Sequence, residues 1–106
     1  MVVIEFNSGK AKCTSLSHHS VSCRKENSSI ILFGRIIVGN PCHELTHTVS
    51  ILEDKLEIHL HVKRLPGFCV QCIAEIPFQI LIREVPEGIK SIIILYQSKA
   101  LYECRI

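Results

Sequence analysis

The sequence predicts an all-β protein, an antiparallel β-sandwich of immunoglobulin-like or small barrel-like form. Three observations support this fold class. Apolar residues either alternate with polar ones or form short β-branched runs. Glycine and proline fall at the breaks between these runs. No convincing amphipathic helical repeat appears outside one ambiguous segment. We therefore expect seven to nine short strands, little or no helix, and one domain over residues 1–106.

The first strands are indicated by two kinds of pattern. Val2, Ile4 and Phe6 occupy every second position at the start of the chain. Residues 30–38 are almost continuously apolar, which is typical of a strand buried on both faces. A break at Gly39-Asn40-Pro41 follows this run.

The second half of the chain continues in the same way. Between Cys72 and Ile82, every second residue is apolar, and Pro77 within this run indicates an edge strand or a bulge. Residues 92–96 and 101–106 form the last two predicted strands.

One segment carries a motif with a specific chemical meaning. His43-Glu44-Leu45-Thr46-His47 matches H-E-x-x-H, the zinc-peptidase signature. On a helix, His43 and His47 would hold zinc and Glu44 would act as general base to the metal-bound water. Asn40 and Pro41 suit the start of such a helix. This arrangement is the alternative prediction, a minimal zinc metallopeptidase.

The same segment fits a strand better. Its β-branched residues favour extended backbone, and Glu53-Asp54 can turn the chain back on itself. A single register then places the apolar residues of both strands on one face and the charges on the other. The inward pairs are Ile51 with Leu56, Val49 with Ile58, His47 with Leu60, and Leu45 with Val62. On a strand, Glu44 points away from both histidines, so we expect no catalytic residue and no metal ligand here.

The six cysteines are the second chemical signal, and their even number indicates structural disulfides in an oxidising setting. A hairpin turning near His18 would pair Cys13 with Cys23. Cys42 is expected to pair with Cys69 or Cys72. Cys104 takes the remaining partner or stays free.

Two other interpretations of these residues stay open. Cys69-Val70-Gln71-Cys72 has C-x-x-C spacing, and with Cys42 and His43 or His47 it would form a structural zinc site. The cysteines would otherwise be buried free thiols. His59 and His61 share the polar face of a predicted strand, where a solvated role is the simpler account and a metal-binding pair the alternative.

Composition and charge give no linear signal for several classes of function. The net charge is only +2 and the basic residues are scattered, so no basic run indicates nucleic acid or an anionic membrane. No apolar run is long enough for a membrane span. The start of the chain lacks the pattern of a leader, which suggests either a cytoplasmic protein or an extracytoplasmic domain without its leader. Abundant Ile and Glu, with Asp54 as the only Asp, suggest a heat-adapted source.

The segment Gly39-Asn40-Pro41-Cys42-His43-Glu44, followed by a strand and then Cys69-Val70-Gln71-Cys72, resembles an uncharacterised archaeal domain family. Its members are often secreted or lipoprotein-attached β-sandwich domains. The resemblance covers roughly residues 34–96. It implies an all-β fold and a structural role for the cysteines, and it implies no activity.

The sequence thus predicts a non-catalytic structural or protein-interaction module that is stapled by disulfides and needs no cofactor. The sequence is compatible with a protein partner but identifies none, and it predicts no nucleic-acid partner. The zinc peptidase and the structural-zinc protein are the alternatives.

Overall fold

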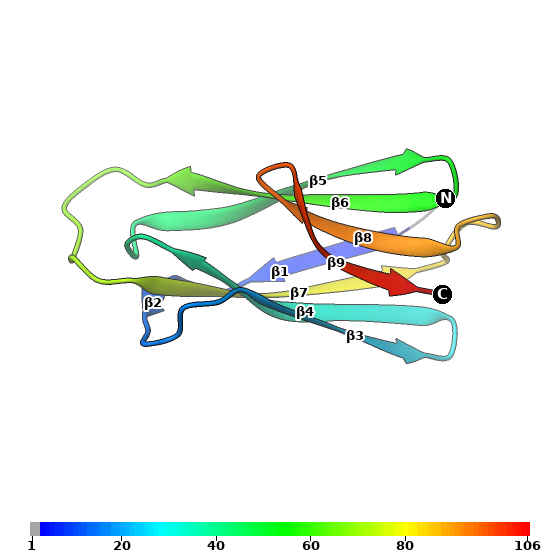
Figure 1. Ribbon diagram of the computed structural model, residues 1–106, viewed down its shortest axis with the longest axis horizontal. Helices are drawn as coiled ribbons and strands as arrows, with labels where there is room; N and C mark the ends of the chain where they lie inside the picture. Colours follow the sequence, from blue (N-terminus) through cyan, green and yellow to red (C-terminus); the bar gives the residue numbers. More distant parts are fainter. Residues whose placement is uncertain (1–2) are drawn as a thin grey trace.

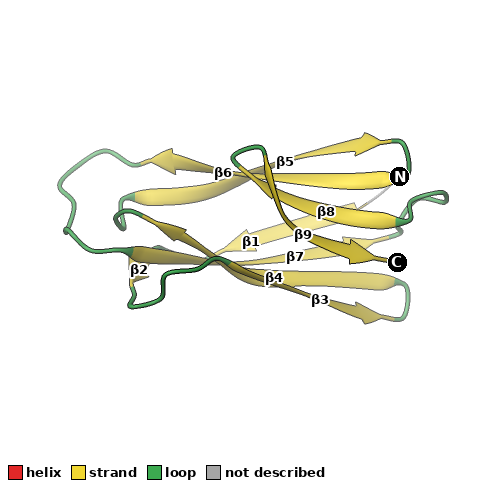
Figure 2. Cartoon of the chain, in the orientation of Figure 1, coloured by secondary structure: helices red, strands yellow, loops and turns green. Residues whose placement is uncertain are grey.

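The computed structural model describes residues 3–106 and shows two stacked β-sheets joined by loops (Figure 1). Within these residues every regular element is a strand, as Figure 2 illustrates. The all-β sandwich prediction is therefore confirmed, with nine strands. They are β1 (Val3–Ser8), β2 (Lys12–Cys13), β3 (Ser20–Glu26), β4 (Ser29–Val38), β5 (His43–Leu52), β6 (Lys55–Arg64), β7 (Ala74–Arg83), β8 (Ser91–Tyr96) and β9 (Lys99–Arg105).

The two sheets are built differently. The first has the order β1-β7-β4-β3, and β2 also pairs with β7, beyond the end of β1. The second has the order β5-β6-β8-β9. All neighbours are antiparallel except β6 and β8, which are parallel. The parallel pair arises because the chain leaves β6 for the first sheet, forms β7, and returns to the second sheet as β8.

The core lies between the sheets and is dominated by aliphatic side chains. In β7 the predicted alternation is confirmed, because every second residue from Ala74 to Ile82 is buried. The largest fully buried side chains come from both sheets: Leu32, Ile36, Leu56, Ile58, Leu60, Ile76, Ile80, Ile82, Ile92 and Ile94. The strong preference for isoleucine fits a core made of strands, where β-branched side chains pack well.

Strand β4 is buried on one face only, which corrects the prediction from its apolar run. Ile30, Leu32, Ile36 and Val38 face the core, whereas Phe33 is 41% exposed. No third layer of described residues covers the outer face of this sheet, so its apolar side chains stay partly in contact with water.

Pro77 lies in β7, a central strand of the first sheet, so the prediction of an edge strand is wrong. The strand pairing beside Pro77 is nevertheless interrupted. Strand β1 ends at Ser8 and β2 begins at Lys12, and Pro77 lies opposite the intervening Gly9. The Gly9 N–H donates to the Pro77 carbonyl at 2.9 Å. In a hydrogen-bonded antiparallel pair, each residue donates one N–H to the other. Proline has no N–H, so the second bond of this pair is missing at the break.

The hairpin of β5 and β6 has the register that the sequence predicts. Leu45 pairs with Val62, His47 with Leu60, Val49 with Ile58, and Ile51 with Leu56. One expectation is corrected: Val49 and Ile51 are 39% and 52% exposed. Strand β5 is an edge strand, so side chains on its inner side are not enclosed by neighbours.

The N-terminal alternation holds for Ile4 and Phe6, which are half-buried, while Val2 lies outside the described residues.

Candidate functional site

The H-E-x-x-H segment is the start of strand β5, so its three polar side chains do not converge. Alternation along the strand sends His43 and His47 toward the inner side and Glu44 toward the outer face, opposite Lys63. Glu44 is exposed and both histidines are half-buried. This geometry separates the glutamate from any ion that the two histidines would share.

Each histidine of the motif has a local structural contact. The Nδ1 of His43 lies 3.0 Å from the Asn40 carbonyl oxygen, to which a ring N–H donates. His47 stacks on Phe6 of β1 in the opposite sheet, with ring centroids 4.4 Å apart. Asn40 does not cap a helix. Its side-chain oxygen accepts a hydrogen bond from the Cys42 N–H at 3.0 Å and closes the turn before β5. The motif thus contributes to packing at the edge of the sandwich.

The cysteines form three disulfides, and the chain has no free cysteine. The expected pairing of Cys42 with Cys69 is confirmed. Cys104, whose partner the sequence left open, pairs with Cys23. The three disulfides indicate an oxidising setting.

The expected pairing of Cys13 with Cys23 is wrong. Cys13 pairs with Cys72 instead. The segment between Cys13 and Cys23 is not a hairpin, because β2 pairs with β7 whereas β3 pairs with β4. The connection carries the chain across to the far edge of the sheet.

The disulfides also bear on the two metal hypotheses. Zinc binds thiolates, and in the disulfides Cys42, Cys69 and Cys72 have none to offer. Among residues 3–106, no group of three or more His, Cys, Asp or Glu side chains is placed to hold a metal ion.

The pair His59 and His61 belongs to a polar ladder on the outer face of β5 and β6. The Nε2 of His59 lies 3.2 Å from Glu57 Oε1, and the Nε2 of His61 lies 3.2 Å from Thr48 Oγ1. Ser50 donates to the same Glu57 oxygen at 3.4 Å. Cross-strand contacts of this kind stabilise a sheet modestly. Both rings therefore have hydrogen-bond partners within the sheet surface.

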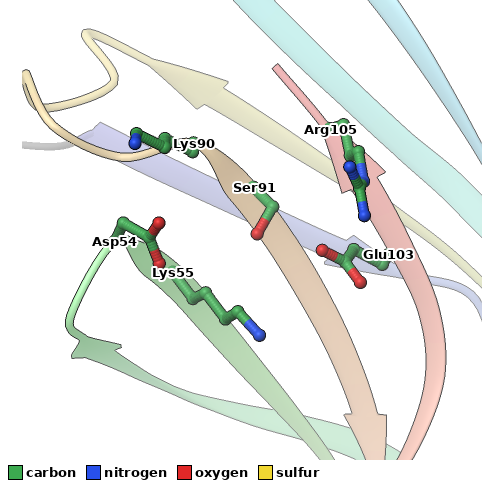
Figure 3. Close-up of a pocket in the computed structure, with 6 residues that line it drawn as sticks. All are labelled: Asp54, Lys55, Lys90, Ser91, Glu103 and Arg105. Carbon is green, nitrogen blue, oxygen red and sulfur yellow. The ribbon is translucent and has the colours of Figure 1, made fainter.

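Two open hollows lie at opposite ends of the sandwich. One, of about 280 Å³, is bordered by charged side chains of both signs, with Ser91 at its floor (Figure 3). The other, of about 520 Å³, lies beside the start of β5. Its lining includes Lys10, Pro41, His43 and Leu65. The first has a mixed charge pattern that favours no ligand class. The second is adjacent to the loop described next.

The connection between β6 and β7, residues 65–73, is a feature that sequence reasoning missed. We call it the clamped loop, because Cys69 and Cys72 within it are bonded to Cys42 and Cys13. Phe68 at its tip is 98% exposed. The sequence signal that could have indicated this loop is Phe68 itself, an aromatic residue between Pro66-Gly67 and Cys69. Because the disulfides of Cys69 and Cys72 hold this loop at the end of the sandwich, the adjacent Phe68 stays outside the core.

His19 is a second residue that sequence reasoning missed. It precedes β3, and its Nδ1 accepts a hydrogen bond from the Ile37 N–H at 2.9 Å. Its ring also meets Tyr96 of the other sheet edge-on, with centroids 5.0 Å apart. Burial, and then the neighbouring His18, lower the pKa of His19 below its usual value, so the neutral ring is favoured. His19 therefore links the two sheets in its uncharged form.

Comparison with known proteins gives no further guide: no protein-family model, curated protein or solved structure matches this chain. Among the described residues, no helix is long and apolar enough to cross a membrane.

Proposed function

We propose that this domain is a non-catalytic protein-interaction module that pairs with an extended segment of a partner along the free edge of β5. Its disulfides support this role, because they hold a small sandwich rigid without a large core. The observation that carries the proposal is the lack of protection on β5. Extended partners add to an exposed sheet edge through main-chain hydrogen bonds, and side chains on the edge provide specificity.

Apart from the two-residue β2, the edge strands of the two sheets are β1, β3, β5 and β9, and they differ in how they are protected against pairing with another chain. Natural edges are blunted by charges, by proline or by shortness. Strand β3 carries Arg24, Lys25 and Glu26, and β9 carries charges at both ends. Strand β1 is six residues long and contains Glu5. Strand β5 is ten residues long, has no Lys, Arg or Pro, and has one acidic residue near its start.

Exposed apolar side chains mark the same edge. Val49, Ile51 and Leu52 are 39%, 52% and 58% exposed and lie together at the end of β5. Covering these side chains would stabilise a complex, since burying one such residue contributes about 1.5–3 kcal/mol. Because His47 already stacks on Phe6, the first half of β5 is anchored and the second half is left for a partner.

The setting that we propose is extracytoplasmic, because disulfides persist in oxidising compartments. The exception is the cytoplasm of hyperthermophiles, where intracellular disulfides are common. The resemblance to secreted archaeal domains is consistent with the extracytoplasmic proposal.

A selection of random peptides on the oxidised domain tests the proposal. We expect the selected peptides to be extended and rich in β-branched residues, and to protect the amides of β5 from hydrogen exchange. Ile51→Lys should weaken their binding at least about tenfold, because it places an unpaired charge in the contact. Phe33→Lys is the matched control, since Phe33 is an exposed apolar residue on a central strand. Peptides that bind Ile51→Lys as well as wild type would refute the proposed edge.

A further inference from the structure

The clamped loop projects apolar side chains from one end of the sandwich, far along the molecule from the exposed residues of β5. In Figure 1 it is the yellow-green connection between β6 and β7, at the extreme left. Phe68, Val70 and Ile73 are 98%, 61% and 49% exposed. An aromatic side chain that is almost fully exposed gains nothing from the core, so the fold itself gives no reason for its position.

The loop is held at both of its ends as well as by its disulfides. The Leu65 N–H donates to the Cys42 carbonyl at 2.9 Å, and the Thr14 N–H donates to the Ile73 carbonyl at the same distance. Arg64 adds a hydrogen bond to the Cys42 carbonyl at 3.3 Å. The loop is therefore presented in one conformation, and little conformational freedom is left to lose when it contacts another surface.

Basic side chains that are separate in the sequence gather around this loop. Lys63 and Arg64 end β6 directly before the loop. Lys10 lines the same hollow as Leu65, and Lys12 precedes Cys13, which is bonded to Cys72 of the loop. Among the described residues, none of the four forms an ion pair with a carboxylate.

Two acidic residues lie near this end of the molecule. Glu75 is 3.8 Å from Arg35 and also lies across from Lys12 in the pairing of β2 with β7. Glu44 lies across from Lys63 in the pairing of β5 with β6. The end that carries Phe68 is thus apolar at its tip and positive around its base.

We propose that the clamped loop docks the domain on an anionic phospholipid surface, with Phe68 and Val70 entering the interfacial layer and the four basic residues contacting headgroups. Aromatic side chains favour the membrane interface, and each lysine or arginine near an anionic leaflet strengthens binding about fivefold. The apolar residues of the loop and the positive charge around its base match the two layers of an anionic membrane, an apolar interior beneath negative headgroups.

This inference is independent of the proposed pairing of β5. The exposed residues of β5 lie near the opposite end of the sandwich, beside the turn that leads into β6. A domain docked through its clamped loop would hold that edge away from the lipid surface. Failure of either proposal would leave the other standing.

The test uses the oxidised domain and vesicles of phosphatidylcholine with or without phosphatidylglycerol. Because the chain has no tryptophan, Phe68→Trp introduces a single fluorescent probe at the tip. We expect its emission to shift to shorter wavelength with phosphatidylglycerol vesicles and to shift less with phosphatidylcholine alone. Phe33→Trp on the outer face of β4 is the control, and its emission should not shift.

Co-sedimentation with the same vesicles measures the contribution of each part. Phe68→Ser should weaken binding about tenfold. Lys63→Glu with Lys10→Glu should weaken binding at least about 25-fold, about fivefold for each lysine lost, and should remove most of the salt dependence. Circular dichroism and thiol counting confirm that each variant is folded and oxidised. Equal binding to both vesicle types, no binding to either, or wild-type binding by Phe68→Ser would each overturn the proposal.

Discussion

The two ends of the sandwich keep their shape by different means. At one end, the connections at residues 14–19, 39–42 and 65–73 meet, and two disulfides tie the last of them to Cys42 and to Cys13 of β2. At the other end, the strands are joined mainly by short turns (Figure 1). Two of the three disulfides thus occur where the backbone has few neighbours to pair with, and the third, Cys23–Cys104, joins edge strands of the two sheets. Where strands turn tightly, sheet hydrogen bonds and turn chemistry are sufficient.

The turn end illustrates the second case. Asn27 and Glu53 adopt left-handed backbone angles, with φ of 52° and 58°, which allows the chain to reverse within two residues. The Lys90 N–H donates to the Asp54 carbonyl at 2.7 Å, and the Ile106 N–H donates to the Lys90 carbonyl at 2.9 Å. These bonds join three segments of the second sheet without a disulfide.

The largest expected effect is on the free energy of unfolding. It should differ between the disulfide that joins the two sheets and a disulfide of the clamped loop. Removing Cys23–Cys104 by double serine substitution should cost about 5 kcal/mol of unfolding free energy, because it opens an 81-residue separation and places a polar group at the buried Cys104. Removing Cys42–Cys69, with a separation of 27, should cost about 3 kcal/mol.

Urea unfolding of both variants under non-reducing conditions measures this difference. Peptide mapping under non-reducing conditions should find the two remaining native disulfides in each sample, so that reshuffled pairs do not affect the comparison. If removing Cys42–Cys69 cost as much unfolding free energy as removing Cys23–Cys104, or more, the disulfide of the clamped loop would contribute at least as much to global stability as the link between the sheets.

A smaller effect concerns local order at the two ends. In the variant lacking Cys42–Cys69, we expect chymotrypsin to cleave after Phe68 at least about tenfold faster than in the wild-type domain, because local opening of the loop becomes easier. The turn at Glu53-Asp54 should stay intact. Mass spectrometry of a short digestion locates the cuts. Uniform cleavage throughout the chain would mean that the domain unfolds as a whole, and that the ends are not independent.

The next effect depends on pH and involves His19. Its pKa is lowered in the folded state, so its contribution to stability is present above the unfolded value near 6.5 and is lost as pH falls below it. Protonation also removes the acceptor for the Ile37 N–H. We expect the free energy of unfolding, measured with urea, to fall by about 1 kcal/mol between pH 7 and pH 5.

His19→Asn tests the assignment, since its amide oxygen can accept a hydrogen bond without titrating. This variant should lose most of the pH dependence, whereas His61→Asn should keep it. Matching pH profiles for His19→Asn and wild type would place the dependence elsewhere.

The smallest expected effect is at the motif that looks catalytic. Glu44→Gln should change stability by less than about 0.5 kcal/mol, because Glu44 is exposed and forms no ion pair with the described residues. Peptidase activity on unfolded casein should be the same, at background, for both proteins. A measurable activity that disappears in Glu44→Gln would restore the zinc-peptidase hypothesis.

Local patterns predicted much of this fold, and the reason is visible in the hairpin of β5 and β6. Alternation in two adjacent segments and a turn between them determine one register, and the structure has that register. The same logic placed His43, Glu44 and His47 on a strand. Alternation does not report whether an opposing layer covers a side chain, which is why the exposure of Val49 and Ile51 was missed.

The features that sequence could not predict depend on how distant segments meet. The partners of Cys13 and Cys23 depend on which strand lies beside which, and neither is a neighbour in sequence. The parallel pairing of β6 with β8 has the same origin. Phe68 was missed because its exposure depends on where the loop lies relative to the two sheets, which the apolar pattern does not report.

The position of β7 has a consequence for synthesis on the ribosome. This strand hydrogen-bonds to β1, β2 and β4, although it is made seventh. Until it emerges, β1 has no partner strand and the first sheet is only a hairpin of β3 and β4. The nascent chain therefore carries unpaired, isoleucine-rich segments for most of its translation, which favours chaperone binding and premature aggregation over early folding.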